Sequence, residues 1–274
     1  MARSWIEFVQ SQLIAWQRGP LDAVRKGCEV KVLSADSETG ARSLLVRYPS
    51  GFSAAGGALS VDDEFLVLEG ALDIGGRSYP EMTYAHLPAG FETGVWACRE
   101  ATVVLEFFSG TPARAAKPVA YDEGRLVLHR NAFDITYTGN FHPEFPPGAG
   151  RKMLYQDPQT RDATWLLGTL PLRWAERSEV HPTVEEMYLL GGEVHGNRGI
   201  MRPGAYFWRP PSLPHGPYGT QTGNLYFFRT KGGDLSTSYV APEKPFRWWP
   251  HYDAVLPPEL EAARGEVPSG ARRW

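Results

Sequence analysis

Residues 179–192 read EVHPTVEEMYLLGG, and residues 209–217 read RPPSLPHGP. The first seven residues of the longer stretch hold one His and two Glu, and the shorter stretch adds a second His. Imidazole and carboxylate groups together are the ligands of many divalent metal sites. The sequence therefore predicts a metal site made of Glu179, His181, Glu185 and His215.

The spacing of these residues is typical of strands. Side chains two apart on a strand face the same side, so Glu179 and His181 are expected to face one interior. Glu185 follows after a turn at Pro182, and His215 arrives from a Pro-rich turn. An eight-stranded barrel is wide enough to hold a metal and one small ligand, so we expect the four side chains to meet inside such a barrel.

The composition also favours short strands. The 274 residues are enough for one large domain or two small ones, and they include 29 Gly and 23 Pro. Short apolar runs alternate with clusters of turn residues from residue 30 onward, which is typical of an antiparallel sandwich or barrel. Residues 1–28 fit a short helix or two extended pieces equally well. The predicted fold class is all-β.

The β pattern occurs twice in the chain. Four patches match in the same order at offsets of 120 to 123 residues, which predicts one β unit duplicated in tandem. The matches are KVL at 31–33 with KML at 152–154, DEFLVLEG at 63–70 with EEMYLLGG at 185–192, LPAG at 87–90 with PPSL at 210–213, and LEFF at 105–108 with LYFF at 225–228.

Charge and cysteine content narrow the function classes. The net charge of −3 and the absence of a Lys/Arg block argue against nucleic acid and anionic membranes as partners. Cys28 and Cys98 form no CxxC motif or disulfide framework, which favours a reducing compartment. We find no signal peptide or long apolar span in the sequence and expect a cytoplasmic protein.

These motifs resemble those of the cupin superfamily. Its first motif, His-x-His followed by a Glu and, after six residues, a Gly, is matched by His181, Glu185 and Gly192, with Glu179 in place of the first His. Its second motif resembles residues 203–215. The tandem layout is similar to bicupins of the ChrR-like or uncharacterised two-cupin kind, over residues 29–240. The resemblance implies two jelly-roll (double-stranded β-helix) barrels, which we expect at 1–120 and at 121–274 with a C-terminal extension.

The second barrel is expected to hold the metal. Two His and one carboxylate with open positions form the facial triad of non-heme Fe(II) oxygenases, and the set also suits Mn, Zn or Ni. Glu179 has three open interpretations: a fourth ligand, a catalytic general base with a raised pKa, or a solvent-facing residue. The first repeat has no imidazole at the equivalent positions Gly57, Leu59, Asp63 and Glu92, so we expect it to be a structural half.

Aromatic residues near the motifs are candidates for a substrate pocket. We expect Tyr188, Tyr206, Trp208 and Tyr226 to line it, with Arg209 as an anchor for a carboxylate or enolate. Such a pocket favours a small apolar substrate, aromatic or diketone-like. His195 is expected in a hairpin, facing solvent.

The resemblance leaves several functions open. We expect a metal-dependent enzyme, with a non-heme Fe(II) dioxygenase as the leading hypothesis. The alternatives are a redox-neutral lyase, isomerase or cyclase with a Zn, Mn or Ni Lewis acid, and a non-catalytic ChrR-like sensor of a metal or ligand. A homodimer is a further expectation.

Overall fold

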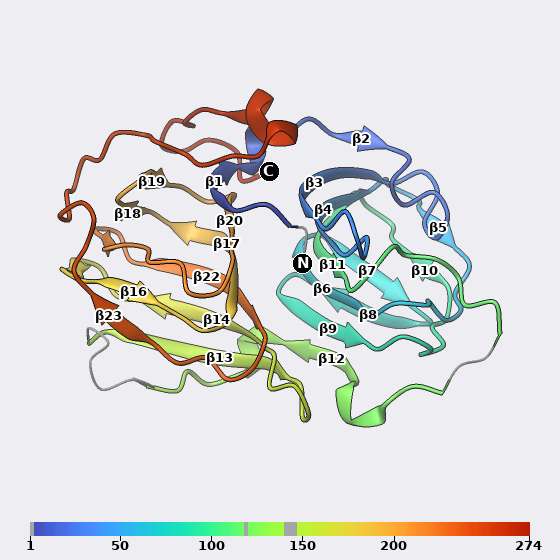
Figure 1. The fold of residues 1–274 in the computed structure, drawn as a ribbon. Helices are drawn as coiled ribbons and strands as arrows, with labels where there is room; N and C mark the ends of the chain where they lie inside the picture. Colours follow the sequence, from blue (N-terminus) through green and yellow to red (C-terminus); the bar gives the residue numbers. More distant parts are fainter. Residues whose placement is uncertain (1–2, 118–119, 140–146) are drawn as a thin grey trace. The chain divides into compact units, whose positions relative to one another are not determined.

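The computed structural model describes residues 3–117, 120–139 and 147–274. The chain forms two compact units, one made mainly of Ala15–Asp134 and the other of Ser4–Ile14 with Ile135–Trp274. Both consist of antiparallel strands with a few short 3-10 helices (Figure 1), which confirms the predicted all-β class. Among the described residues, no helix combines the length and hydropathy that crossing a membrane requires.

The first unit contains a large and a small sheet. The large sheet has the order β12-β9-β6-β11-β4-β3-β2, and the small sheet has the order β5-β10-β7-β8. Apolar side chains such as Val46, Phe65 and Trp96 form its core. The strands are β2 (Gln17–Arg18), β3 (Glu29–Ala35), β4 (Arg42–Tyr48), β5 (Ser53–Ala54), β6 (Asp63–Glu69), β7 (Ala71–Ile74), β8 (Arg77–Pro80), β9 (Thr83–Leu87), β10 (Trp96–Ala97), β11 (Thr102–Phe108) and β12 (Val127–Asn131).

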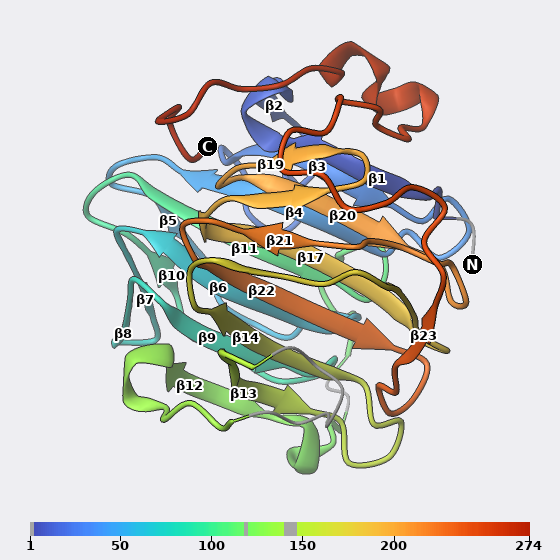
Figure 2. The same cartoon turned by 90° about the vertical axis from the view of Figure 1, so that its left-hand side faces the viewer.

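The second unit repeats this plan. Its large sheet has the order β1-β20-β17-β22-β14-β13 (Figure 2), and smaller sheets have the orders β15-β21-β18-β19 and β16-β23. The strands are β1 (Ile6–Gln10), β13 (Ala149–Gln156), β14 (Ala163–Thr169), β15 (Arg173–Trp174), β16 (Ser178–Val180), β17 (Val184–Gly192), β18 (Val194–Gly196), β19 (Gly199–Met201), β20 (Ala205–Arg209), β21 (Gly219–Thr220), β22 (Asn224–Lys231) and β23 (Ser238–Val240).

Strand pairing shows which positions of the two units correspond. Phe65 pairs with Glu106 in the first unit, and Met187 pairs with Phe228 in the second. The counterpart of Glu106 is therefore Phe228, two residues beyond the position that the LEFF and LYFF patches indicate. The sequence match slipped because both strands are almost wholly apolar, so a shift by two residues preserves the pattern of inward and outward side chains.

The strands that precede each barrel in the sequence are exchanged between the units. β1 comes before the first barrel but pairs with β20 of the second unit. β12 comes before the second barrel but pairs with β9 of the first unit. The ambiguous N-terminal segment is thus a strand followed by the 3-10 helix η1 (Ser11–Leu13). Each exchanged strand covers a sheet edge that would otherwise present unpaired backbone groups.

The C-terminal segment holds β1 from its other side. The backbone amide of Glu7 donates to the carbonyl of Val255 at 2.8 Å, and the amide of Val255 donates back at 2.7 Å. Beyond this bridge lies the 3-10 helix η4 (Pro258–Ala263), and the Arg202 side chain donates to the carbonyl of Val267 at 2.9 Å. The C-terminal extension is therefore part of the second unit and fixes its N-terminal strand.

The glycine that ends the first motif has a conformational reason to be there. Gly192 has φ +75°, and a Cβ at this position would lie 1.9 Å from the carbonyl oxygen of Gly223. Both facts exclude a side chain, because the backbone is left-handed and the backbone just before β22 passes too close. Gly70 shares the positive φ, +78°, in the first unit.

The interior of the first unit is occupied by an arginine. Arg25 forms buried ion pairs with Asp63 and Glu106, and its guanidinium carbon lies 3.7 Å from the ring centre of Trp96. Asp63 is the counterpart of Glu185, since the two pair with Leu87 and Arg209 at equivalent places. A guanidinium thus supplies the positive charge at the centre of this barrel.

We predict that Arg25→Met destabilises the protein. The substitution leaves the carboxylates of Asp63 and Glu106 buried without their cation, which costs about 3–5 kcal/mol of unfolding free energy. Urea-induced unfolding measures the change. The control is Arg99→Met at an exposed position, expected to change stability by less than about 0.5 kcal/mol. Equal stability of the two variants would contradict the prediction.

Candidate metal centre

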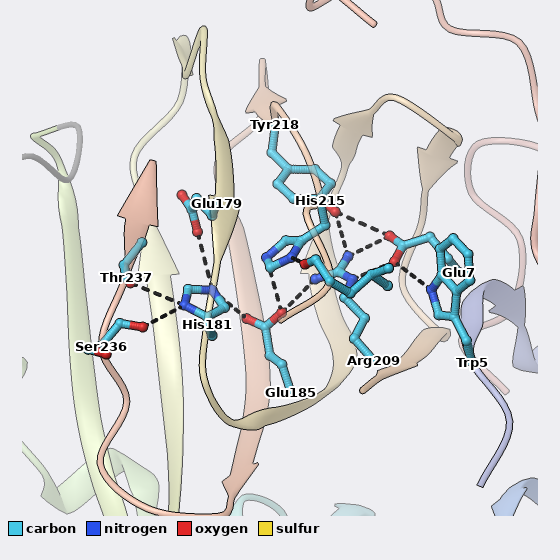
Figure 3. Close-up of polar contacts among 11 residues, drawn as sticks. Trp5, Glu7, Glu179, His181, Glu185, Arg209, His215, Tyr218, Ser236 and Thr237 are labelled. Atoms are coloured by element: carbon cyan, nitrogen blue, oxygen red, sulfur yellow. Dashed lines mark hydrogen bonds and ion pairs between the residues drawn. The ribbon is translucent and has the colours of Figure 1, made fainter. Parts of the chain in front are cut away.

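The four predicted ligand residues come together in the second unit (Figure 3). Glu179 lies on β16 and Glu185 lies near the start of β17, with His181 in the turn between them. His215 lies in the loop that leads to β21, and its backbone pairs with that of Glu179 through hydrogen bonds of 2.9 and 3.0 Å. This bridge joins the two sequence motifs, because it places the end of the second beside the start of the first.

The side chains face one another across short distances. His181 Nε2 lies 3.7 Å from Glu179 Oε2 and 3.8 Å from Glu185 Oε1. His215 Nε2 lies 3.4 Å from Glu185 Oε2. One ligand atom each from Glu179, His181 and His215 lies within 4.8 Å of the other two. Two imidazoles and a carboxylate are therefore grouped closely enough to bind one ion.

Backbone carbonyls orient both imidazoles. His181 Nδ1 lies 3.0 Å from the carbonyl oxygen of Ser236, and His215 Nδ1 lies 2.9 Å from that of Leu213. A carbonyl oxygen only accepts, so each Nδ1 donates a proton to it, and Nε2 is the nitrogen that is directed toward the carboxylates. Such a contact at the second nitrogen accompanies almost every metal-binding His, because it fixes the tautomer and the ring orientation.

The electrostatics of the site also suit a cation. Burial and the positive charge of Arg209 lower the pKa of His215 to about 4, so the ring is neutral at pH 7. Burial acts to raise the pKa of Glu185, but His215, Arg209 and His181 outweigh it and lower that pKa to about 2. Burial raises the pKa of Glu179, and the charge of Glu185 adds to this effect. A neutral His215 imidazole beside buried carboxylates fits a divalent metal.

A buried ion-pair network lies beside the grouped ligands. Arg209 donates to Glu185 at 2.6 Å, to the hydroxyl of Tyr218 at 2.5 Å, and through two nitrogens to both carboxylate oxygens of Glu7. The hydroxyl of Tyr218 donates to Glu7 at 3.1 Å. Glu7 comes from β1, so the N-terminal strand completes the surroundings of the site. These contacts hold Glu185 in place, and the positive charge of Arg209 balances its negative charge.

Sequence reasoning did not identify Glu7. The residue lies in a segment that reads as helix or strand with equal ease, and no motif connects it to positions beyond residue 179. Only the pairing of β1 with β20 brings it to Arg209.

The site opens into a cavity of about 110 Å³. A cavity of this size corresponds to a small organic ligand. Glu179, His181, Glu185, His215, Arg209 and Tyr226 line the cavity together with apolar side chains that include Trp165, Leu167, Met201, Phe207 and Phe228. Of the predicted pocket residues, Tyr226 and Arg209 are thus in the lining.

Tyr188, Tyr206 and Trp208 do not line this cavity, and their predicted pocket role is corrected. Glu185, Met187 and Leu189 face the interior, so alternation along β17 turns Tyr188 to the other face. The hydroxyl of Tyr188 lies 3.1 Å from that of Ser11, and Tyr206 donates to Glu186 at 2.5 Å.

Two further expectations are corrected by the structure. His195 does not face solvent: it is 3% exposed, and its Nδ1 contacts the carbonyl oxygen of Trp248. In the first unit, the counterpart of His215 is Thr93 rather than Glu92, because Gly57 donates to the carbonyl of Thr93 as Glu179 donates to that of His215. The hairpin predicted around residue 195 is present as β18 and β19, but the C-terminal extension covers it.

We predict that Glu7→Gln lowers the stability of the second unit. The change removes the negative charge that faces the buried guanidinium of Arg209, which costs about 3 kcal/mol. The charge of Arg209 lowers the pKa of Glu7 in the folded state, although burial alone would raise it. A carboxyl group whose pKa is lower in the folded than in the unfolded state stabilises the protein at a pH above the unfolded value of about 4.3. This stabilisation is lost as the pH falls. The melting temperature of Glu7→Gln should therefore lie below that of the wild type at pH 7, and the difference should become smaller below about pH 4.

The control for this variant is Glu243→Gln. Glu243 has a side chain that is 71% exposed and lies 3.8 Å from Arg198, so its replacement should leave stability almost unchanged. A Glu7→Gln protein as stable as this control, at every pH, would show that the network contributes nothing.

Solved structures with the same fold cover most of the chain. A protein from Nostoc punctiforme, named a "putative dioxygenase", is 20% identical, with 88% of this chain and 92% of that chain covered and a TM-score of 0.78. A variant of oxalate decarboxylase from Bacillus subtilis is 11% identical, with 85% and 79% covered and a TM-score of 0.57. Hazelnut (Corylus avellana) vicilin is 9% identical, with 86% and 89% covered and a TM-score of 0.59. At these identities the likeness shows the fold alone.

These similarities confirm that the chain has the cupin fold in its two-domain form. None of the curated proteins matches the chain. Its sequence matches a family described as a domain of unknown function over residues 9–237, a range that includes both β patterns and all four predicted ligand residues. The protein thus belongs to the DUF4437 family.

Proposed function

We propose that this protein is a metal-dependent enzyme that acts on a small organic substrate in its second barrel, with Fe(II)-dependent dioxygenation as the reaction. The observation that carries the proposal is the pair of imidazoles whose Nδ1 atoms are held by carbonyl oxygens while both Nε2 atoms face the carboxylates of Glu179 and Glu185. The name of the similar Nostoc punctiforme protein supports the reaction class.

Each residue of the candidate site has a separate role in this proposal. His181, His215 and Glu179 would hold the metal as two imidazoles and one carboxylate, the composition of a facial triad. Glu179 is assigned to the ligands rather than to the general-base role, because its carboxylate is grouped with both rings. Glu185 remains ionised between the rings and Arg209, where it strengthens the negative field around the cation. A bound ferrous ion would supply redox chemistry with O₂ and Lewis acidity.

The cavity supports an apolar reactant. Side chains such as Leu167, Met201 and Phe207 exclude water from the space beside the ligand group, and this strengthens electrostatic interactions there. The ring of Trp165 stacks on Phe228, with 5.7 Å between the ring centroids. These walls would orient a flat or branched organic molecule against the metal ligands.

Metal analysis tests the ligand assignment. We expect the wild-type protein to bind about one Fe(II) per chain, and His181→Gln and His215→Gln to weaken binding by more than about tenfold, since even the loss of an outer hydrogen-bond partner has an effect of that size. The measurement is metal content and titration with Fe(II) under anaerobic conditions. The Glu179→Gln variant tests the carboxylate in the same way.

The matched control is His195→Gln. His195 is buried in the same unit and is also held through Nδ1 by a carbonyl oxygen, but it does not line the cavity. Its replacement should leave metal content unchanged. If His181→Gln retains as much metal as His195→Gln, His181 is not a ligand.

Oxygen consumption tests the reaction class. We expect the Fe(II)-loaded protein to consume O₂ with a β-diketone or hydroxylated aromatic substrate, and His215→Gln to lose this activity. An oxygen electrode and product analysis measure both. Turnover of the same substrate at an equal rate under nitrogen would reject the dioxygenase and favour a redox-neutral lyase, isomerase or cyclase.

A further inference from the structure

The hydroxyl of Tyr226 is a polar group on the cavity wall that the proposed metal site does not use. Tyr226 lies on β22, is 8% exposed, and lines the cavity. Its ring centroid lies 5.2 Å from that of Phe228, the next inward-facing residue of the strand. Arg173 and Glu179 act electrostatically on the phenol, so its hydroxyl end lies near two other residues of the lining.

Most other hydroxyl groups of the lining already have a partner in the protein. The hydroxyls of Tyr218, Thr169 and Thr237 each take part in a hydrogen bond. Thr220 Oγ1 has no partner in the described part of the chain, but this residue is more deeply buried than Tyr226, at 2% exposed. The Tyr226 hydroxyl is therefore the more accessible of the two that remain for a ligand.

Asn224 fixes the direction in which the Tyr226 hydroxyl donates. Asn224 and Thr169 are opposite residues of β22 and β14, and the Thr169 hydroxyl donates to Asn224 Oδ1 at 2.5 Å. The amide nitrogen of Asn224 is left to face the phenol. A hydrogen bond from Asn224 lowers the pKa of Tyr226, which is the effect of a donor on a phenol oxygen. The Tyr226 oxygen thus accepts from Asn224, and its proton remains to be donated.

The phenol keeps this proton at neutral pH. Burial raises the pKa of Tyr226 above its ordinary value of about 10, although the charge of Arg173 acts in the opposite direction. Among the residues that the structure describes, none accepts a hydrogen bond from the Tyr226 hydroxyl. Donors that are almost fully buried nearly always have an acceptor, because an unmade bond is costly. The position of this donor in the lining indicates that a molecule in the cavity supplies the acceptor.

We propose that Tyr226 is a specificity-determining residue that donates a hydrogen bond from its hydroxyl to an oxygen of the substrate. The substrate class is a small molecule with an apolar body and an acceptor oxygen, such as a ketone. Leu167, Met201 and Phe228 provide apolar walls for the body. An analogue without the oxygen would leave the donor unpaired and bind less well than its apolar surface allows. This inference rests on the proposed function for the identity of the site, but the hydrogen bond itself requires no metal.

A matched pair of neutral probes tests the hydrogen bond. Cyclohexanone and methylenecyclohexane have nearly the same shape, and only the ketone has an acceptor oxygen. Both are titrated calorimetrically into the wild type and into Tyr226→Phe, which loses the hydroxyl and keeps the ring. We expect Tyr226→Phe to weaken binding of cyclohexanone about fivefold, the effect of one net hydrogen bond, and to change binding of methylenecyclohexane by less than about twofold.

The matched control is Tyr252→Phe. The Tyr252 hydroxyl accepts from the amide of Gly265 at 3.2 Å in the same unit, and Tyr252 does not line the cavity. Its removal should leave both dissociation constants as in the wild type. Thr220→Val removes the second hydroxyl without a partner and should weaken ketone binding less than Tyr226→Phe does.

Three outcomes of these titrations would overturn the proposal. The first is a wild type that binds neither probe at millimolar concentration. The second is a Tyr226→Phe protein in which both probes bind more weakly to the same extent, or in which neither does. The third is a selective loss of ketone binding in Thr220→Val with none in Tyr226→Phe, which would assign the donor to Thr220.

Infrared spectroscopy gives a readout that a merely structural role of Tyr226 would not change. A hydrogen bond weakens the C=O bond, so the carbonyl stretch of bound ¹³C-labelled cyclohexanone should lie at lower wavenumber in the wild type than in Tyr226→Phe. The spectra are recorded on chelator-treated protein, in which no metal polarises the carbonyl. The same wavenumber in both proteins would show that Tyr226 does not donate to the ligand.

Metal content distinguishes failure of this inference from failure of the proposed function. The titrations are carried out on chelator-treated and on Mn(II)-loaded protein, and Tyr226→Phe should retain the Mn(II) content of the wild type. A wild type that binds no divalent metal but shows the Tyr226-dependent preference would overturn the proposed function alone. A metal-binding protein without that preference would overturn the role of Tyr226 alone.

Discussion

The buried contact between Arg209 and the carboxylates of Glu7 and Glu185 is the interaction on which the second unit depends. A guanidinium group without water must be surrounded by negative charge, or the charge would be too unfavourable to bury. Glu185 meets part of this requirement from the neighbouring strand β17, and Glu7 meets the rest from β1. The metal-ligand group, the exchanged strand and the C-terminal extension that pins this strand are therefore parts of one arrangement.

Both units bury carboxylates that require a positive charge beside them, and the two units differ in how that charge is provided. In the first, Arg25 occupies the interior and pairs with Asp63 and Glu106, the first of which is the counterpart of Glu185. In the second, Arg209 lies to one side and leaves space for imidazoles, so that an ion can provide the central positive charge. The change from Leu87 to Arg209 at equivalent places of β9 and β20 accompanies this difference. A duplicated framework thus supports one filled barrel and one with a cavity.

The cavity of the second unit combines charged and apolar walls. Its lining includes the carboxylates and imidazoles of the candidate metal site together with apolar side chains such as Leu167, Met201 and Phe207. A small ligand in this space would meet both kinds of wall, which restricts the ways in which it can bind.

The sequence by itself determined the all-β class, the duplication and the residues of the candidate metal site. These depend on local patterns: alternation along strands, turn residues such as Gly192, and the spacing of His181, Glu185 and His215. The same alternation corrects the placement of three aromatic residues: with Glu185 inward, Tyr188 on β17 faces outward, and with Arg209 inward, Tyr206 and Trp208 on β20 face outward.

Only the tertiary structure decided what surrounds those ligands. The partnership of Glu7 with Arg209 spans most of the chain and follows from β1 crossing to the second unit, which no local pattern encodes. Burial of His195 and the opposition of Arg173 and Thr220 likewise depend on which strands and segments pack together. Pairing between distant segments is chosen by the free energy of the whole fold, so it becomes visible only when the fold is known.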